Sequence, residues 1–491
     1  MVKVKDLIDF ISPQSVLGSR DKDIVDITQD SREAGDSIAF LAREGFETDG
    51  HKYIEDAYQK GSRVFFVEKI PEFIREDALY IKLSDTTGAL GDLAAEVHGH
   101  PEEDLDIYGV TGTNGKTTTC YILYDLFNKM GDKSGLMGTI KIDTGEKQIK
   151  SDRTTPGADE IFRQLASMRQ SGCRKAVMEI SSHALDLNRV EALEFSAAVL
   201  TNISQDHLNF HRSMEEYLRT KLSIFELLKR KEGRGYYNAD DERITRAISN
   251  RDRDFQDLFS FSLINDSDFQ GSILSLDLNG VEFELNGSEY FLPIPGKYNI
   301  YNAIAALSVL LREDFAGDKL SEALARFQGV PGRLESVSAG KNLEYEIVVD
   351  YAHTPSGMKN VLRTLKQLKP GSITAVFGCG GDRDRSKRPK MGRIALKYAD
   401  KVIITSDNPR SENPKDIIDD IISDINFSSY NTSWCIEVDR EKAIRRAVKE
   451  IDAGEIVVIF GKGHENYQEL SNERIKFDDR KKALKALQDL E

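Results

Sequence analysis

A nine-residue run at 111–119, Thr-Gly-Thr-Asn-Gly-Lys-Thr-Thr-Thr, constrains the fold of this chain more than any other stretch. It stands between a strand-like segment and a helical one, which is the setting that a phosphate-binding loop needs. Glycine lets backbone N–H groups turn inward, the helix N-terminus adds partial positive charge, Lys116 supplies a full charge, and Thr117 offers a hydroxyl to Mg²⁺. Only two residues separate Gly112 from Gly115, so the loop is a shortened form. A Thr/Gly-rich turn that merely caps a helix would not need this order of elements, and we predict a nucleoside triphosphate site.

Composition limits the class of protein. The chain has 491 residues, 40% of them hydrophobic and 30% charged, which predicts a globular protein of about three domains. Its net charge of −15 argues against a general nucleic-acid or membrane-surface binder. The four cysteines lie far apart with no C-x-x-C pair, which favours reduced, buried thiols in a cytoplasmic protein. No apolar stretch is long enough to span a membrane, and we expect a monomer with small-molecule partners and no nucleic acid.

We predict an α/β protein of three domains, built around a central P-loop ATPase-like parallel sheet. A small N-terminal α/β domain spans 1–104, because short helices and strands alternate up to a polar boundary at 101–104. The central domain spans 105–333 and includes antiparallel hairpins expected between about 259 and 295. The C-terminal domain, 334–491, alternates strands and helices, which predicts a mostly parallel Rossmann-like sheet. Its expected strands lie near 344–350, 373–378, 401–406 and 455–460.

Polar residues follow the strands of the central domain. Glu179 and His207 come after two apolar strands, so both could reach the sheet edge that carries the phosphate-binding loop. A carboxylate at that place completes the shell of a Mg²⁺ ion that bridges the phosphates. Taken alone, Glu179 is equally well interpreted as a strand-end residue facing solvent. By composition Lys221 is an ordinary helical lysine, and we interpret His211 as a surface residue.

The C-terminal domain has polar loops after four expected strands, at 350–355, 378–385, 407–410 and 461–465. The carboxyl ends of parallel strands meet at one edge, so these loops outline one pocket rich in Arg, Asp, Asn and Glu. Such a pocket suits a zwitterion, because Arg grips a carboxylate in two places while acidic or amide groups hold an ammonium. For the charged residues around 383–388 the competing interpretation is a solvated charge run, which we favour for Arg385 and Lys387.

With these motifs together, the sequence resembles the Mur ligases, the ATP-dependent amide-forming enzymes of peptidoglycan precursor synthesis, over nearly the whole chain. The matching positions are 111–118, 179–183, 206–207, 221, 299 with 302, 331–333, 350–353 and 407–410. In the first domain, 30–32, 35–36 and 49–51 are similar to the members that add 2,6-diaminopimelate to UDP-N-acetylmuramoyl-L-alanyl-D-glutamate. The resemblance implies a cytoplasmic enzyme of cell-wall synthesis that uses ATP and Mg²⁺.

The resemblance implies roles at the matching positions of the central domain. ATP would be held by Thr113, Asn114, Gly115, Lys116, Thr117, Thr118, Asn302 and Arg333. Two Mg²⁺ ions are implied, the first bound by Thr117 and Glu179 and the second by His207. Lys221 falls where the family carries a carbamylated lysine, whose carbamate helps to hold the second ion. The implied catalytic residues are Lys116, Glu179, His207 and Lys221.

The resemblance also implies the substrate contacts. Those to the UDP-sugar substrate fall on Ser31, Thr154, Thr155, Ser181 and Arg189, and Leu187 stands where the family often has Gln. Those to diaminopimelate fall on Arg383, Asp407, Asn408, Pro409, Arg410, Gly461 and Glu465. In the family the pattern at 407–410 accompanies meso-diaminopimelate, because its Arg can grip the carboxylate that lysine lacks.

The implied reaction has two steps. The D-glutamate carboxylate attacks the γ-phosphate of ATP to give an acyl phosphate, and the amine of diaminopimelate then displaces phosphate. Asp350 or His353 could assist a proton transfer. The alternatives are the L-lysine-adding enzyme of the same family, a folylpolyglutamate-type ligase, and a nucleotide-binding switch. Arg410 disfavours the first, the first-domain motifs disfavour the second, and the lack of an Asn-Lys-x-Asp guanine reader disfavours a GTPase switch.

Overall fold

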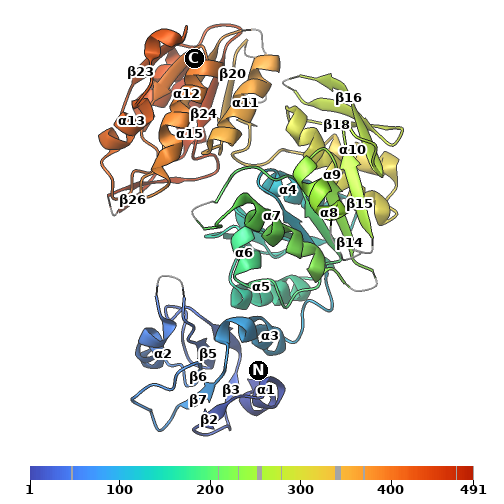
Figure 1. Ribbon diagram of the computed structural model, residues 1–491, viewed down its shortest axis with the longest axis vertical. Helices are drawn as coiled ribbons and strands as arrows, with labels where there is room; N and C mark the ends of the chain where they lie inside the picture. The colour runs from blue at the N-terminus through green and yellow to red at the C-terminus, as the bar shows by residue number, and fades with distance from the viewer. Residues whose placement is uncertain are drawn as a thin grey trace. The chain divides into compact units, whose positions relative to one another are not determined.

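The computed structural model of the protein describes residues 1–45, 48–207, 210–229, 232–250, 257–277, 279–337, 344–368, 371–471 and 473–489. The chain forms two compact units (Figure 1). The first contains Met1–Phe269 and Ala305–Phe315, and the second contains Gln270–Ile304 and Ala316–Glu491. Each is described by itself below.

The first unit begins with a five-stranded sheet of order β2-β7-β6-β5-β4. These strands are β2 (Ser15–Leu17), β4 (Asp26–Thr28), β5 (Ile38–Leu41), β6 (Val64–Val67) and β7 (Leu79–Lys82). All pairs are parallel except β2 with β7. The helical elements are α1 (Val4–Ile11), η1 (Gly50–Tyr53), α2 (Ile54–Gln59) and α3 (Thr86–His98), and β1 (Val2–Lys3) pairs with β3 (Asp23–Ile24). This is the small α/β domain expected at the N-terminus.

The same unit then forms the sheet that carries the phosphate-binding loop. Its strands are β8 (Asp106–Thr111), β9 (Ser134–Met137), β12 (Lys175–Glu179), β13 (Ala197–Leu200), β14 (Arg234–Asn238) and β15 (Leu258–Ser262), with β10 (Lys141–Asp143) and β11 (Gln148–Lys150) beyond β9. The order is β11-β10-β9-β12-β8-β13-β14-β15, parallel from β9 onward. Its helical elements are α4 (Lys116–Lys129), α5 (Ala158–Gln170), α6 (Ser182–Asp186), α7 (Met214–Leu222), η2 (Ser223–Leu227) and α8 (Glu242–Ser249). The loop therefore follows a strand with parallel neighbours on both sides.

Helix α3 of the N-terminal sheet packs against α5 of the central sheet. Polar contacts continue this interface beside the helices. The Arg163 guanidinium binds Asp26 with an Nε–Oδ2 distance of 2.6 Å, and Nε2 of Gln29 donates to Oδ1 of Asp159 over 2.8 Å. The end of β4 is thus fixed to the first turns of α5.

The second unit opens with an antiparallel meander of β16 (Phe269–Leu276), β17 (Val281–Leu285) and β18 (Ser288–Leu292). This confirms the hairpins expected from the alternating pattern, although position 278 lies outside the described residues. The helices α9 (Lys297–Arg312) and α10 (Gly317–Leu324) follow. Helix α9 is divided between the units, because 305–315 belong to the first.

A six-stranded sheet of order β19-β20-β24-β21-β22-β23 forms the C-terminal part. Its strands are β19 (Glu335–Ser336), β20 (Glu346–Asp350), β21 (Ile373–Phe377), β22 (Lys401–Ile404), β23 (Ser433–Ile436) and β24 (Ile456–Phe460). All but β19 are parallel. The remaining elements are α11 (Pro355–Leu368), η3 (Arg385–Lys387), α12 (Arg388–Tyr398), α13 (Pro414–Ile422), η4 (Phe427–Ser429), α14 (Arg440–Lys449), α15 (Asp479–Gln488) and the hairpin β25 (Tyr467–Leu470) with β26 (Glu473–Lys476). The four strands expected here are present, and the half-exposed β23 is an additional one.

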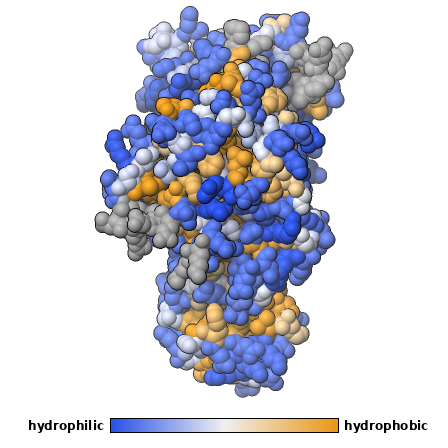
Figure 2. All heavy atoms as spheres, turned by 90° about the vertical axis from the view of Figure 1, so that its right-hand side faces the viewer, coloured by the Kyte–Doolittle hydropathy of each residue, from blue (hydrophilic) through white to orange (hydrophobic). Residues whose placement is uncertain are grey.

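The α/β fold class is confirmed. Three hydrophobic clusters lie on the faces of the N-terminal and C-terminal sheets, and a larger one joins the N-terminal sheet to the central one. The face in Figure 2 is covered mostly by hydrophilic residues, with apolar ones scattered among them. Within the described part of the chain, no helix combines the length and apolar character needed to cross a membrane.

Candidate functional site

The phosphate-binding loop spans 112–115, between β8 and α4. Gly112 and Gly115 have φ angles of +143° and +90°, a region that residues with a Cβ rarely adopt. At Gly112 there is also no room, because an added Cβ would stand 1.9 Å from Oγ1 of Thr201. Both glycines are therefore required by the backbone path, as in other loops that wrap an anion.

The residues after β13 fix this loop from the side. The N–H groups of Thr113 and Asn114 donate to the carbonyl and Oδ1 of Asn202 over 2.8 and 3.1 Å. In return, Oγ1 of Thr201 and Nδ2 of Asn202 donate to the carbonyl of Asn114 over 2.6 and 2.8 Å. Oγ1 of Thr113 lies 3.1 Å from the Tyr217 hydroxyl. The loop is therefore shaped by its neighbours before any nucleotide binds.

Lys116 is the first residue of α4. Its Nζ donates to the carbonyls of Gly112 and Thr113 over 2.8 and 2.9 Å, so the ammonium folds back over the loop. Thr118, two residues further on, is buried in the first turn. A full charge and the helix N-terminus thus act on the same place, which is what an incoming phosphate needs.

Glu179 ends β12 and is only 1% exposed, so the interpretation of a solvent-facing glutamate is wrong. Its Oε2 accepts hydrogen bonds from Oγ1 of Thr117 over 2.9 Å and from Oγ1 of Thr139 over 3.0 Å. Its Oε1 accepts from the N–H of Thr139 over 2.8 Å. The carboxylate is therefore aimed at the hydroxyl of the loop. Carboxylate and hydroxyl oxygens are the ligands that Mg²⁺ prefers, so this pair fits the ion.

Lys221 lies in the last turn of α7 and is 1% exposed, so it is not the ordinary helical lysine that composition indicates. Its Nζ donates to Oγ1 of Thr111 over 3.3 Å, at the end of the strand that precedes the loop. Burial, followed by the charge of Lys116, holds the pKa of Lys221 well below its usual value. Burial therefore disfavours the charged form of this amine.

An aromatic cluster lies beside the loop. The ring centroids of His183 and His207 are 4.9 Å apart, and those of His211 and Tyr217 are 5.1 Å apart. His207 is half-exposed, and its backbone has a φ of +53°. His211 is 2% exposed, which corrects its interpretation as a surface residue. Sequence distance from the loop could not indicate its burial, because the packing comes from α6 and α7.

The residues assigned to the UDP-sugar substrate gather around the start of α6. Oγ1 of Thr155 donates to the carbonyl of Glu179 over 2.8 Å and lies 3.3 Å from Oγ of Ser181. Thr154 reaches the same group through Oγ1 of Thr139, at 3.1 Å. Arg189 donates from Nη1 to the carbonyl of Thr155 over 3.0 Å. Four of the five implied contacts are therefore brought together.

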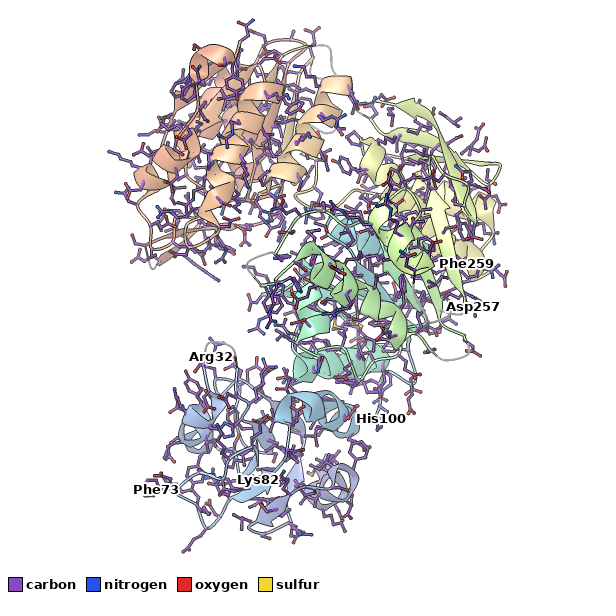
Figure 3. The ribbon with its side chains drawn as sticks, in the orientation of Figure 1. Arg32, Phe73, Lys82, His100, Asp257 and Phe259 are labelled. Carbon is purple, nitrogen blue, oxygen red and sulfur yellow. The ribbon has the colours of Figure 1, made fainter. Side chains whose placement is uncertain are left out.

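Ser31, the fifth, lies on the loop after β4. Figure 3 shows its neighbour Arg32 at the upper end of the N-terminal domain, where its guanidinium forks Asp30. The carbonyl of Ser31 accepts from Nζ of Lys60 over 3.0 Å. Leu187 is the C-cap of α6 and offers no polar atom where the family often has Gln.

Two further arginines belong with Arg189, and sequence analysis missed them. Burial, followed by the charges of Arg153 and Arg43, lowers the pKa of Arg189 to about 10. Burial also lowers the pKa of Arg43, where Asp159 opposes the shift and Arg153 adds to it. None of the three forms an ion pair with any residue that the structure describes. The positive charges of Arg43, Arg153 and Arg189 act on one another, and such a group attracts an anion such as a diphosphate. Arg43 lies in the loop after β5, so only the fold could reveal this grouping.

The remaining ATP positions lie in the second unit. Asn302 is buried in α9, where its Nδ2 donates to Oδ1 of Asn299 over 3.1 Å. The guanidinium of Arg333 stands 4.8 Å from the ring centre of Tyr351. Asp350 accepts from the N–H groups of Leu334 and Ala352, and burial raises its pKa. The carboxylate of Asp350 therefore holds the backbone at Leu334 and Ala352 in place.

The loops after β22 and β24 meet through a buried lysine. Nζ of Lys462, fully buried, donates to Oδ1 of Asn408 and Oε2 of Glu465, both over 2.8 Å, and Nδ2 of Asn408 also binds Glu465. Gly461 has a φ of +109°, and a Cβ there would stand 2.2 Å from Oδ2 of Asp407. Burial acts to raise the pKa of Asp407, but Lys462, Arg440 and the N–H of Asn408 together outweigh it, so the pKa is lowered. Asp407, Asn408, Gly461 and Glu465 are thus brought together, as the sequence predicts.

Arg410 lies on the same loop with a φ of +51°. Its Nε lies 2.9 Å from Oε2 of Glu469, and its Nη1 donates to the carbonyl of Gly381 over 2.8 Å. Pro409 precedes it, and its carbonyl would stand 1.9 Å from a Cβ at Gly381. Arg383 is exposed and donates to the carbonyl of Asp382.

Two buried arginines hold these loops in place. Arg388 is fully buried and binds Glu412 and Asp420, each at 2.7 Å. It is therefore not part of a solvated charge run. Arg385, for which the sequence favours that interpretation, has a side chain that is 63% exposed. Arg440, also fully buried, binds Asp479 of α15 at 2.6 Å. It donates in addition to the carbonyls of Ser406 and Phe460, at the ends of two neighbouring loops.

Comparison with known proteins agrees with this geometry. Family profiles match at 23–98 (Mur ligase family, catalytic domain), 110–310 (Mur ligase middle domain) and 332–463 (Mur ligase, glutamate ligase domain). Two curated relatives, both named UDP-N-acetylmuramoyl-L-alanyl-D-glutamate–2,6-diaminopimelate ligase, are those of Clostridium perfringens and Syntrophomonas wolfei. The first is 39% identical and covers 97% of this chain and 98% of the relative, and the second is 40% identical with 99% of each covered.

Comparison with solved structures also finds Mur ligases. One named as the structure of UDP-N-acetylmuramoyl-L-alanyl-D-glutamate–2,6-diaminopimelate ligase is 30% identical, covers 100% of this chain and 99% of its own, and has a TM-score of 0.66. The MurF ligase of Thermotoga maritima in complex with ADP is 18% identical, with a TM-score of 0.64 and 94% of this chain and 97% of its own covered, which shows a shared fold. This chain belongs to the Mur ligase family.

Proposed function

We propose that the protein joins meso-2,6-diaminopimelate to UDP-N-acetylmuramoyl-L-alanyl-D-glutamate at the expense of ATP, in the synthesis of peptidoglycan precursors. The observation that carries the proposal is the pairing of two sites in one chain. One is a phosphate-binding loop backed by the buried Glu179, and the other is a set of loops that presents Arg410 beside Asp407 and Asn408. Relatives named UDP-N-acetylmuramoyl-L-alanyl-D-glutamate–2,6-diaminopimelate ligase are about 40% identical to this chain over nearly its whole length.

The first site suits the activation of a carboxylate. Lys116 and the N-terminus of α4 would face the phosphates of ATP, with Thr113 to Thr118 wrapping them. Thr117 and Glu179 would hold one Mg²⁺ ion, and His207 with the carbamate of Lys221 a second; the bound ions neutralise charge on the phosphates. Burial lowers the pKa of Lys221 and so favours its neutral amine, the form that reacts with CO₂ to give a carbamate. Asn302 and Arg333 are assigned to ATP on resemblance alone.

The second site suits the amine substrate. Arg410 and Arg383 would meet the carboxylates of diaminopimelate, the carboxylates of Asp407 and Glu465 would accept hydrogen bonds from an ammonium, and Asn408 would line the same site. Pro409 and Gly461 would set the path of the backbone around it. The nucleophilic amine then attacks the acyl phosphate and phosphate leaves. Asp350 or His353 would assist proton transfer, although the two hydrogen bonds that Asp350 accepts favour a structural part for it.

The UDP-sugar substrate would lie along Ser31, Thr154, Thr155, Ser181 and Arg189. The crowded guanidinium groups of Arg43, Arg153 and Arg189 support a diphosphate there. The matched profiles also support division into domains at 1–104, 105–333 and 334–491. We propose that the protein is cytoplasmic, because UDP-linked sugars and ATP are substrates of that compartment. We also propose that it acts as a monomer.

Phosphate release from ATP and Mg²⁺ tests the proposal. The assay contains UDP-N-acetylmuramoyl-L-alanyl-D-glutamate and compares meso-diaminopimelate with L-lysine at equal concentration. Release that depends on diaminopimelate supports the proposed function. Release that depends on lysine instead would keep the ligase and overturn the choice of amino acid. Release that needs no amine would overturn the ligase.

A further inference from the structure

Strand β25 contacts the loop that follows β22. Nε2 of Gln468 donates to the carbonyl of Asp407 over 2.7 Å, and the N–H of Glu469 donates to Oδ1 of Asn408 over 3.0 Å. The N–H of Arg410 donates in turn to the carbonyl of Glu469 over 3.2 Å. Residues some sixty positions later in the chain therefore hold three members of the predicted amino-acid site, and Glu469 contacts two of them.

Arg410 depends on this support because its backbone is strained. A φ of +51° is uncommon for a residue with a side chain and persists only where the surroundings fix it. The backbone bond to Glu469 is one such restraint, and the ion pair between Nε and Oε2 at 2.9 Å is another. Gly380 leaves room for the guanidinium, since an added Cβ there would stand 3.0 Å from Nη1 of Arg410.

The guanidinium of Arg410 carries five N–H donors, one on Nε and two on each terminal nitrogen. Nε faces the carboxylate of Glu469, and Nη1 donates to the carbonyl of Gly381. Among the described residues, no hydrogen bond is made by Nη2 of Arg410. The Nη2 end is therefore the one left for a ligand, because Glu469 holds Nε and the carbonyl of Gly381 holds Nη1.

Glu469 also places a negative charge near the proposed carboxylate of the substrate. That charge is shared, because Oε1 of Glu469 lies 2.8 Å from Nε of Arg474. Removing it would relieve a repulsion through water that is worth about a twofold change in affinity. Losing the ion pair that orients Arg410 is worth about tenfold. Orientation therefore outweighs repulsion.

We propose that Glu469 is a positioning residue for diaminopimelate, which acts by orienting Arg410, and that it contributes to the discrimination against lysine. This inference rests on the proposed function. It concerns a residue that the sequence motifs do not include, since the motif ends at Glu465.

The test compares Glu469→Ala and Glu469→Gln with the matched control Glu473→Gln, an exposed glutamate of the same hairpin. For Glu469→Ala we expect the KM for diaminopimelate to rise about tenfold, while the KM for ATP and kcat change less than twofold. Glu469→Gln keeps an oxygen for Nε and should give a smaller rise. The control should match the wild type. An unchanged KM for diaminopimelate in Glu469→Ala, with or without a lower Tm, would overturn the inference.

A double-mutant cycle with Arg410→Lys tests the route of action. If Glu469 acts through Arg410, Glu469→Ala should change the KM less than twofold in the Arg410→Lys background. A full tenfold effect there would overturn the inference. The two proposals fail differently: wild-type protein without diaminopimelate-dependent phosphate release refutes the function, whereas an active wild type with unaffected Glu469 variants refutes only the role of Glu469.

Discussion

The phosphate-binding loop and the loops of the predicted amino-acid site are held in shape by different kinds of interaction. Around 112–117, hydrogen bonds with the loop backbone shape the site: Lys116 donates to backbone carbonyls, and Asn202 exchanges hydrogen bonds with the loop. Around 380–410, charged pairs do it, with Lys462 on Glu465, Arg410 on Glu469 and Arg388 on Glu412.

The difference fits the ligands. In a site shaped by hydrogen bonds with the backbone, the positive charge of Lys116 would act on polyanionic phosphates. A site whose charges balance one another has little net attraction for any ion, and it selects a zwitterion by where each donor and acceptor stands. On the proposed assignment of the two sites, selectivity for the amino acid would be a matter of position, and selectivity for the nucleotide would be largely a matter of charge.

The largest effect is expected at the loop. Lys116→Ala should lower kcat for phosphate release roughly a thousandfold, about 4 kcal/mol, because the ammonium that meets the phosphates is lost. Lys129→Ala, at the exposed end of the same helix, is the control and should be near wild type. Retained activity in Lys116→Ala would show that charge is not what this loop contributes.

Removal of a charged pair should destabilise the C-terminal loops of the predicted amino-acid site. Glu412→Gln breaks the pair with the fully buried Arg388 and should cost about 3 kcal/mol of unfolding free energy by urea titration. The Arg388 hydrogen bond lowers the pKa of Glu412 from 4.5 to about 2. The stabilisation is therefore complete above pH 4.5 and is lost as the pH falls through about 2. A variant with the same acid dependence as wild type would contradict this.

Arg410→Lys should raise the KM for diaminopimelate about thirtyfold, about 2 kcal/mol, because lysine cannot fork a carboxylate. The ratio of diaminopimelate to lysine use should fall by a similar factor, and the KM for ATP should not move. An unchanged ratio would show that selectivity lies in another residue.

The smallest effect is expected at the guanidinium cluster. Arg43→Met should raise the KM for the UDP-sugar substrate about fivefold, about 1 kcal/mol, and weaken its dependence on salt. Arg20→Met, on an exposed loop of the same domain, is the control. If both variants behave alike, the diphosphate does not depend on Arg43.

The sequence predicted most of the fold, because strand, loop and helix signals are local. The hairpins and the four C-terminal strands lie where alternation and apolar runs indicated. The placement of single side chains was harder. Glu179 is buried because Thr139, forty residues away, donates to it, and Arg388 is buried although it ends a charged run. His211 and Arg43 likewise depend on partners from other elements. The roles of these residues in binding remain predictions.

The pair of Arg440 and Asp479 has a consequence for the far end of the chain. Asp479 starts α15, and Arg440 binds the carbonyls just before Asp407 and Gly461. A frameshift or protease cut that removes α15 would strand a guanidinium in the interior and loosen both loops at once. Such a shortened protein would still bind ATP but would no longer recognise its amino acid, a selective defect caused some seventy residues away from the position that fails.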